Sequence, residues 1–233
     1  MTWLNYWNKK NLWSNSDIWK KNNEIFFKKT SKIFNYNNTH TVLDIGCGKG
    51  DFAKKISDKV NLVYCLDTSE EFISICKNNL GSANNVKILK LNSDYTNLSL
   101  LKDIKFSIII ANSVVQYYKS QEEIVELVKS VKKIAINNAY FLISDIEVSK
   151  NKKKSYYQLI YNSIIGGYFF SLVKIGIKLL FNKEYTNAMK QQPILVVDLE
   201  KLIKDIVPLV KKVSTVSENL TVNIDRKHLL IKF

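Results

Sequence analysis

Arginine is almost absent from this chain: Arg226 is the single arginine among 35 basic residues. The planar guanidinium of arginine binds phosphate and guanine through two parallel hydrogen bonds, a contact that lysine does not make. The formal net charge of +14 would otherwise indicate nucleic acid or a membrane surface as partner. Because the lysines are scattered along the whole sequence, we interpret them as a solvated surface and expect no nucleic-acid partner.

Cysteine and histidine are also scarce, with three and two residues respectively. Cys47, Cys65 and Cys76 form neither a C-x-x-C pair nor a ligand cluster with a histidine, so we expect no metal ion. Single thiols of this kind are typical of a reducing compartment. The first residues also lack the basic region and apolar core of a signal peptide, so the sequence predicts a cytoplasmic protein.

The chain has 233 residues, 46% of them hydrophobic, which suffices for one α/β domain with an added cap or lid. It shows no internal repeat and no convincing linker between domains. Within this single domain we distinguish an N-terminal helical cap (1–38), an α/β core (39–149), a helical insert or lid (150–192), and a C-terminal helix and strand pair that completes the core (193–233).

A glycine-rich loop is the most informative motif. Residues 42–50 read Val-Leu-Asp-Ile-Gly-Cys-Gly-Lys-Gly, and they predict a strand that runs into Asp44, a tight loop, and a helix that begins near Asp51. Glycines at alternate positions let the backbone pass close under a ligand, and the following helix turns free N–H groups toward it. The spacing differs from the dinucleotide fingerprint G-x-G-x-x-G, because position 51 is aspartate.

Three further strands end in polar residues. Residues 60–66 predict a strand that ends at Asp67, where a carboxylate can accept both ribose hydroxyls of a nucleoside that lies across the strand ends. Residues 86–91 lead into Asn92-Ser93-Asp94-Tyr95, and residues 106–111 lead into Asn112-Ser113. A helix over 121–133 and a fifth strand over 140–146 follow. After a helix capped by Asp198, two strands near 210–216 and 227–233 are close enough to pair in antiparallel fashion.

In order and spacing, residues 41–147 resemble the class I S-adenosylmethionine-dependent methyltransferases, of the type that acts on small molecules. The resemblance implies an α/β fold with a doubly wound, mostly parallel seven-stranded sheet and an antiparallel last strand. It also implies S-adenosyl-L-methionine as cofactor, bound by Asp44, Gly46, Cys47, Gly48, Gly50, Asp67, Thr68, Ser93, Asp94, Tyr95, Asn112 and Ser113. In this scheme Asp44 attracts the methionine ammonium group and Asp94 accepts from the adenine amino group. The alternative for Asp94 is a simple turn-forming aspartate.

Two segments lie outside the common fold. All four tryptophans fall within the N-terminal cap, where they either shape an acceptor pocket or fill the seam between cap and core. The second segment, residues 155–181, is very apolar and follows the basic stretch 150–154. If it is helical, Gly166-Gly167 should break or kink it near the middle. We leave three interpretations open for it: a lid over the acceptor, a homodimer interface, or peripheral contact with the inner face of a membrane.

Candidates for catalysis are few. We expect Tyr6, Trp7, Gln116 and Tyr117 to form the acceptor pocket, and Tyr117, Asp145 and Glu147 to assist catalysis. The expected acceptor is a small molecule, with O-methylation of a sugar-linked or phosphorylated intermediate of surface-glycan or secondary metabolism favoured. Alternatives are an RNA methyltransferase, which the sequence disfavours because it has no Asn-Pro-Pro-Tyr tetrad, and a non-catalytic protein that binds the cofactor or a membrane as a partner subunit.

Overall fold

A seven-stranded sheet forms the centre of the computed structural model, which describes residues 2–9, 17–92, 95–148, 153–223 and 225–233. The strand order is β3-β2-β1-β4-β5-β7-β6. The first five strands are parallel, and β7 runs antiparallel to both β5 and β6. The predicted fold class is therefore confirmed. The strands are β1 (Thr41–Ile45), β2 (Leu62–Asp67), β3 (Val86–Lys90), β4 (Phe106–Asn112), β5 (Ala135–Ile146), β6 (Lys212–Thr215) and β7 (Lys227–Lys232).

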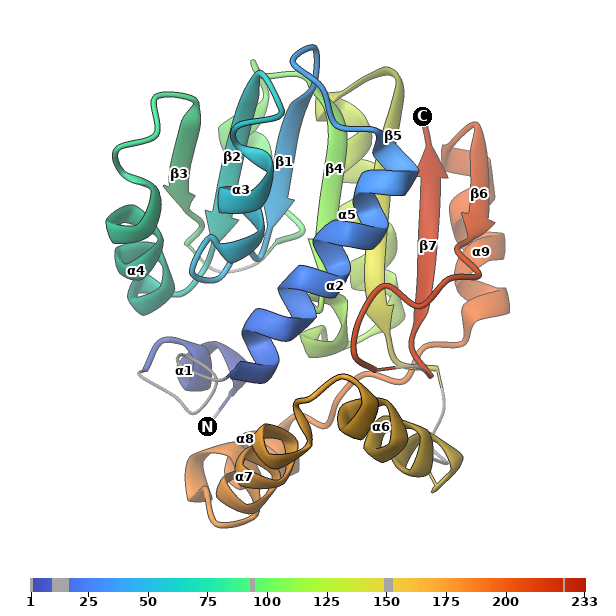
Figure 1. Ribbon diagram of the computed structural model, residues 1–233. Helices are drawn as coiled ribbons and strands as arrows, with labels where there is room; N and C mark the ends of the chain where they lie inside the picture. The colour runs from blue at the N-terminus through green and yellow to red at the C-terminus, as the bar shows by residue number, and fades with distance from the viewer. Residues whose placement is uncertain (1, 10–16, 93–94, 149–152, 224) are drawn as a thin grey trace.

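Helices cover both faces of the sheet. In Figure 1 α2 and α3 cross in front of the strands and α5 lies behind them. The buried clusters agree: side chains of α2, α3 and α4 form one, and those of α5 and α9 form the other. The helices of these layers are α2 (Asp17–Phe34), α3 (Asp51–Ile56), α4 (Glu70–Leu80), α5 (Gln121–Ile134) and α9 (Leu199–Ile206), with short 3-10 turns η1 (Ser99–Leu101), η2 (Val115–Tyr117) and η3 (Val207–Leu209).

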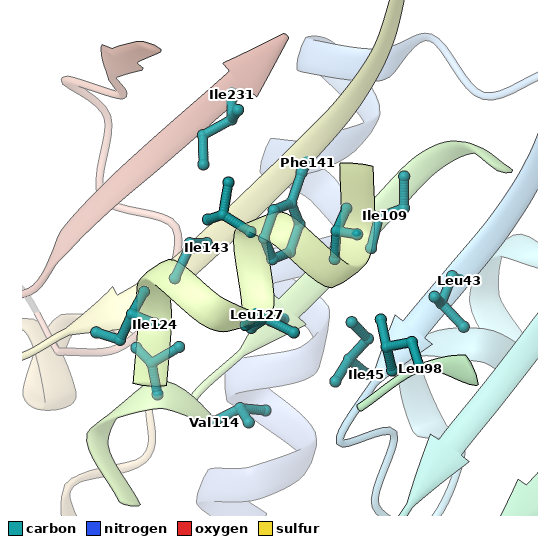
Figure 2. Close-up of a cluster of buried hydrophobic side chains, with 14 of the residues drawn as sticks. Leu43, Ile45, Leu98, Ile109, Val114, Ile124, Leu127, Phe141, Ile143 and Ile231 are labelled. Carbon is teal, nitrogen blue, oxygen red and sulfur yellow. The ribbon is translucent and has the colours of Figure 1, made fainter. Parts of the chain in front are cut away.

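The larger core lies between α5 and the sheet. Figure 2 shows Ile124 and Leu127 of α5 beside Phe141 and Ile143 of β5, and all four side chains are fully buried. Burial of such a side chain contributes about 1.5–3 kcal/mol to folding. On the polar side of the same helix, Glu122 and Glu123 occupy the first turn, where carboxylates complement the helix dipole. Glu123 also lines the cavity of the candidate active site described below.

Within the described part of the chain, four helices lie outside these layers, beyond the carboxyl ends of the parallel strands (Figure 1). They are α1 (Trp3–Trp7), α6 (Lys153–Ile165), α7 (Phe169–Leu180) and α8 (Lys183–Gln191). The predicted break at Gly166-Gly167 is found between α6 and α7, where Gly167 has a φ of +70°. Helix α8 falls within the predicted helical insert (150–192), although no separate helix was expected after residue 181. Among the residues that the structure describes, each helix is too short or too polar to cross a bilayer.

Candidate active site

A cavity of about 440 Å³ opens at the carboxyl ends of β1, β2 and β4. This volume lies within the range of small-molecule sites. Its walls come from the loops that follow these three strands, from α1 and α2, and from the start of α5. Ligands of doubly wound sheets bind at this edge, next to the point where the strand order reverses. In this sheet that point is β1, which has β2 on one side and β4 on the other.

The glycine loop forms the floor of the cavity. Gly46 and Gly48 line it, and both have positive φ values, +73° and +55°. A Cβ atom on Gly46 would lie 2.4 Å from Cγ2 of Val114, so the loop can approach its neighbours only without a side chain. Gly50 has another role: it precedes α3, and a Cβ there would meet Leu80 at 2.5 Å. Gly50 is not among the described residues that line the cavity.

Asp67 holds the glycine loop and faces the cavity at the same time. One carboxylate oxygen, Oδ2, accepts a hydrogen bond from the Gly48 amide at 2.9 Å, and the other, Oδ1, accepts one from the Ser69 amide at 2.8 Å. Burial raises the pKa of Asp67 to about 6. The two amide hydrogen bonds lower this pKa and so oppose the effect of burial. The carboxyl group is therefore ionised at pH 7. Asp67 also lines the cavity, where its carboxylate can accept from a hydroxyl donor.

A second space, of about 30 Å³, lies beside the first and shares Gly46, Asn112 and Ser113 with it. Asp44 lines this smaller space. Oδ2 of Asp44 and Oδ1 of Asn112 are buried and have no hydrogen-bond partner among the described residues. Burial raises the pKa of Asp44 to about 8, and the charge of Asp67 adds to the rise. Two unsatisfied buried acceptors are costly, and a ligand ammonium group would satisfy both.

Tyr95 and Thr68 form the side of the cavity next to β3. The Tyr95 hydroxyl accepts a hydrogen bond from the Thr68 amide at 3.3 Å and lies 3.3 Å from the Thr68 hydroxyl oxygen. Both residues line the cavity, and their predicted contact with the cofactor stays a prediction. Ser93 and Asp94 lie outside the described residues, so their expected place at the adenine ring stays a prediction.

Asp145 and Glu147 are held behind the cavity and are not among its described lining residues. Glu147 Oε2 lies 3.2 Å from Arg226 Nη2, and Asp145 Oδ1 lies 3.7 Å from Arg226 Nε. Burial raises the pKa of Asp145, and Arg226 works against this rise. Gln116 also contacts Arg226 and is buried outside the lining. The predicted catalytic carboxylates therefore form an ion-pair cluster with the chain's one arginine.

Ser113 connects this ion-pair cluster to the cavity. It lines both spaces, and its hydroxyl donates to Oδ2 of Asp145 at 2.7 Å. Its φ of +59° is unusual for a residue with a side chain. Asp145, with a φ of +67°, is also held in this conformation. Two strained residues in contact at a strand end mark a functional region of the backbone.

Aromatic side chains build the outer wall. Trp3, Trp7, Trp19, Phe72 and Tyr117 all line the cavity, and their rings contact one another, with Trp3 and Tyr117 centroids 4.9 Å apart. The Trp3 indole N–H donates to the Gln192 carbonyl at 2.7 Å, and this hydrogen bond joins the aromatic wall to the residue that follows α8. Trp7 and Tyr117 thus line the cavity, and their expected part in an acceptor pocket stays a prediction.

Tyr6 differs from its aromatic neighbours. It is fully buried against Trp3 and Tyr185, and it is not among the described residues that line the cavity. Its ring therefore packs the seam between α1 and α8. This is the alternative that we left open for the aromatic residues of the N-terminal cap.

Two charged residues of the cavity were not predicted. Lys119 and Glu123 both line it, and Glu123 Oε2 accepts a hydrogen bond from the Lys119 amide at 2.9 Å. This bond ties the loop after β4 to the first turn of α5. Their signal in the sequence is their place directly after Gln116 and Tyr117, at the start of a predicted helix. Glu123 keeps its second oxygen for a ligand.

The three cysteines converge beneath the glycine loop. The sulfur atoms of Cys47, Cys65 and Cys76 lie within 4.8 Å of one another, and all three residues are buried. Hydrogen bonding with Cys65 and Cys76, together with burial, raises the pKa of Cys47, so this thiol stays protonated at neutral pH. Sequence spacing did not reveal the cluster, because its members come from a loop, a strand and a helix. The expectation that the chain binds no metal ion stays a prediction.

Comparison with known proteins agrees with this geometry. A family model described as a methyltransferase domain matches residues 37–212, and the chain belongs to this family. The resemblance to class I methyltransferases is thereby confirmed at the level of family and fold. A search of curated protein sequences finds no match.

Solved methyltransferases share the fold at low sequence identity. Phosphoethanolamine N-methyltransferase 1 of Haemonchus contortus, solved with phosphoethanolamine and S-adenosylhomocysteine, has a TM-score of 0.66 at 14% identity over 99% of this chain and 47% of that one. The N-methyltransferase NodS of Bradyrhizobium japonicum, solved with S-adenosylhomocysteine, has 0.57 at 11% identity over 98% and 94%. The pyocyanin biosynthetic protein PhzM has 0.58 at 10% identity over 90% and 54%. The chain therefore spans about half the length of the first and the third of these proteins.

Proposed function

We propose that this protein transfers a methyl group from S-adenosylmethionine to a small-molecule acceptor. The observation that carries the proposal is the pair of adjoining spaces at the ends of β1, β2 and β4. The larger one contains a carboxylate suited to ribose hydroxyls, at Asp67. The smaller one contains two unsatisfied acceptors suited to an ammonium group, at Asp44 and Asn112. S-Adenosylmethionine has both groups, at opposite ends of one molecule.

The residues present fit this cofactor. Asp67 would accept from the ribose hydroxyls, Tyr95 and Thr68 would flank the adenine, and Asp44 and Asn112 would accept from the ammonium group. When bound, the cofactor supplies an electrophilic methyl group on a sulfonium centre. The protein's part in an in-line displacement is to align the acceptor and to exclude water. The aromatic wall, with Trp3 and Tyr117 in contact, performs the second task.

The acceptor proposal rests on the size and lining of the larger cavity. The cavity of about 440 Å³ would hold the cofactor's nucleoside as well, so the space left for the acceptor beside the aromatic wall suits a small molecule with a flat or apolar face better than a macromolecule. Lys119 lies at this cavity and would pair with a phosphoryl group. Glu123 would accept the proton of an acceptor hydroxyl group, the task first expected of Asp145 or Glu147. These residues support O-methylation of a sugar-linked or phosphorylated intermediate.

The test is transfer of labelled methyl groups. Purified protein is incubated with S-adenosyl[methyl-³H]methionine and a cell extract separated into RNA, protein, lipid and small-metabolite fractions. We expect label in the metabolite fraction or in glycan or lipid precursors, and its loss with the Asp67→Ala variant. Labelled RNA would overturn the assignment of a small acceptor. If every fraction stays unlabelled while S-adenosylhomocysteine binds, the protein is a non-catalytic binding subunit and the proposal is wrong.

A further inference from the structure

The outer face of α7 is apolar and exposed. Phe170, Leu180 and Phe181 have 86%, 77% and 83% of their surface exposed, and Val173 and Ile177 lie between them on the same side of the helix. The opposite side of α7 packs against the protein. Its Leu172, Ile175 and Leu179 belong to a hydrophobic cluster with Ile18 and Ile25 of α2. The helix therefore has one apolar side packed against the protein and a second one turned away from it.

Helix α6 repeats this arrangement. Tyr157, Tyr161 and Ile165 are 78%, 63% and 69% exposed, and Ile160 and Ile164 share their side of the helix. Together the exposed apolar side chains of α6 and α7 form what we call the outer patch. Large apolar patches on a protein surface mark contact with another molecule or with a membrane.

The outer patch does not form part of the candidate active site. None of its residues belongs to the described lining of either space. The segment that covers the site is α8 with the residue after it, because Ala188 packs in one cluster with Trp3 and Tyr6, and Gln192 bonds Trp3. The segment that covers the site is therefore α8 and not residues 155–181. The outer patch must contact something other than the active-site ligand.

Charge identifies the partner. Between Glu147 and Glu184 the sequence contains no aspartate or glutamate, and it contains seven lysines. Two of them, Lys174 and Lys178, are exposed one turn apart on α7, at the margin of its apolar side. An apolar helix face bordered by lysines, with tyrosines beside it, is the pattern of a helix that lies in the interface of an anionic bilayer.

A second copy of the chain fits this surface poorly. A twofold interface brings the same patch of both subunits together, and the sequence of α6 and α7 contains no aspartate or glutamate, so Lys174 and Lys178 would find no carboxylate in the partner's patch. A lipid surface with phosphate headgroups satisfies the same lysines, and its acyl region takes up Phe170, Leu180 and Phe181.

We propose that the outer patch of α6 and α7 docks this protein on membranes that contain anionic lipids. The helices lie along the surface, since neither is long enough to span it. This inference concerns a surface apart from the methyl-transfer site and holds whatever the acceptor is. Because α6 and α7 lie beyond the carboxyl ends of the strands, as Figure 1 shows, docking brings the end of the molecule that holds the cavity close to the bilayer.

The experiment is sedimentation of the full chain with vesicles of phosphatidylcholine alone or with about 30% phosphatidylglycerol. We expect binding to the anionic vesicles, weakened by salt. Phe170→Gln with Leu180→Gln should lower binding at least about tenfold through lost apolar burial. Lys174→Gln with Lys178→Gln should lower it about 30-fold, because each lysine near an anionic surface contributes about 1 kcal/mol.

A matched control removes two lysines elsewhere. Lys132→Gln with Lys133→Gln changes the net charge equally on α5 and should leave binding within about threefold. Unchanged affinity for S-adenosylhomocysteine shows that each variant is folded. Equal losses in both lysine pairs would mean that net charge alone acts, and would overturn the proposal. A dimer that Phe170→Gln with Leu180→Gln dissociates, without vesicle binding by the original chain, would also overturn it.

Discussion

Asp44 offers the sharpest test of the cofactor site, because its charge state should change when the ligand binds. Its Oδ2 atom is buried without a partner among the described residues, and burial raises its pKa to about 8. At pH 7 the free protein therefore holds about 0.9 proton on this carboxyl group. A ligand ammonium group favours the ionised form and lowers the pKa again, so binding must release that proton.

The sign and size of the pH effect follow from this release. Below pH 8 one proton leaves for each ligand bound, so affinity rises by up to about tenfold per pH unit and levels off above pH 8. At pH 9 the release falls to about 0.1 proton, because the carboxyl group is already ionised. Asp44→Asn keeps the size and one oxygen of the side chain but has no proton to lose.

Titration calorimetry with S-adenosylhomocysteine in two buffers of different ionisation enthalpy measures the proton count. We expect the count for the original protein at pH 7 to exceed that for Asp44→Asn by about 0.9. The ligand's own protonation is common to both proteins and cancels in the difference. Asp58→Asn, on an exposed aspartate, is the matched control and should behave like the original protein. Equal counts in the original protein and Asp44→Asn would refute the assignment of Asp44 to the ammonium group.

Three other substitutions test the remaining parts of the site. Asp67→Ala removes an acceptor for charge-assisted hydrogen bonds of about 1.5–3 kcal/mol, so calorimetry should show S-adenosylhomocysteine affinity about 10- to 150-fold lower, and wild-type affinity would exclude the ribose assignment. Gly48→Val adds a branched side chain at a φ of +55°, and the protein should keep its circular dichroism spectrum while losing cofactor binding. Glu123→Gln keeps the bond to the Lys119 amide but has no basic oxygen, so kcat should fall about 10²- to 10⁴-fold at unchanged cofactor affinity; an unchanged kcat would assign Glu123 to helix capping alone.

Features that depend on neighbouring residues could be predicted from the sequence. The glycine loop, the carboxylate of Asp67 at a strand tip and the break at Gly166-Gly167 each follow from local rules of backbone geometry. The N-cap of α9 is another example, because Asp198 accepts from the Lys201 amide at 3.0 Å, as expected of an aspartate before a helix. Such signals span only a few positions, and the sheet order followed from the family resemblance that they support.

Contacts between distant segments could not be predicted in this way. Asp145 and Glu147 end a strand at the correct edge of the sheet, but Arg226, more than 70 positions later, pairs with both. Gln116 is held by the same arginine. The sequence did not indicate this pairing, because nothing local marks a partner so far along the chain. Glu123 was missed because its local signal has an ordinary explanation. A glutamate in the first turn of a helix usually only stabilises the helix start, so nothing marked it as a site residue.

The aromatic wall has a consequence for how the molecule assembles. Trp3 and Gln192, which close it, are 189 positions apart. During synthesis α1 lacks its contacts with α8 until that helix has left the ribosome, so the sheet can form first and the wall can be completed last. Helix α1 has five residues and is too short to persist alone, and its attachments break without disturbing a strand. The part of the site that is completed last is therefore also the part held by this short helix, and we expect ligands to enter and leave there.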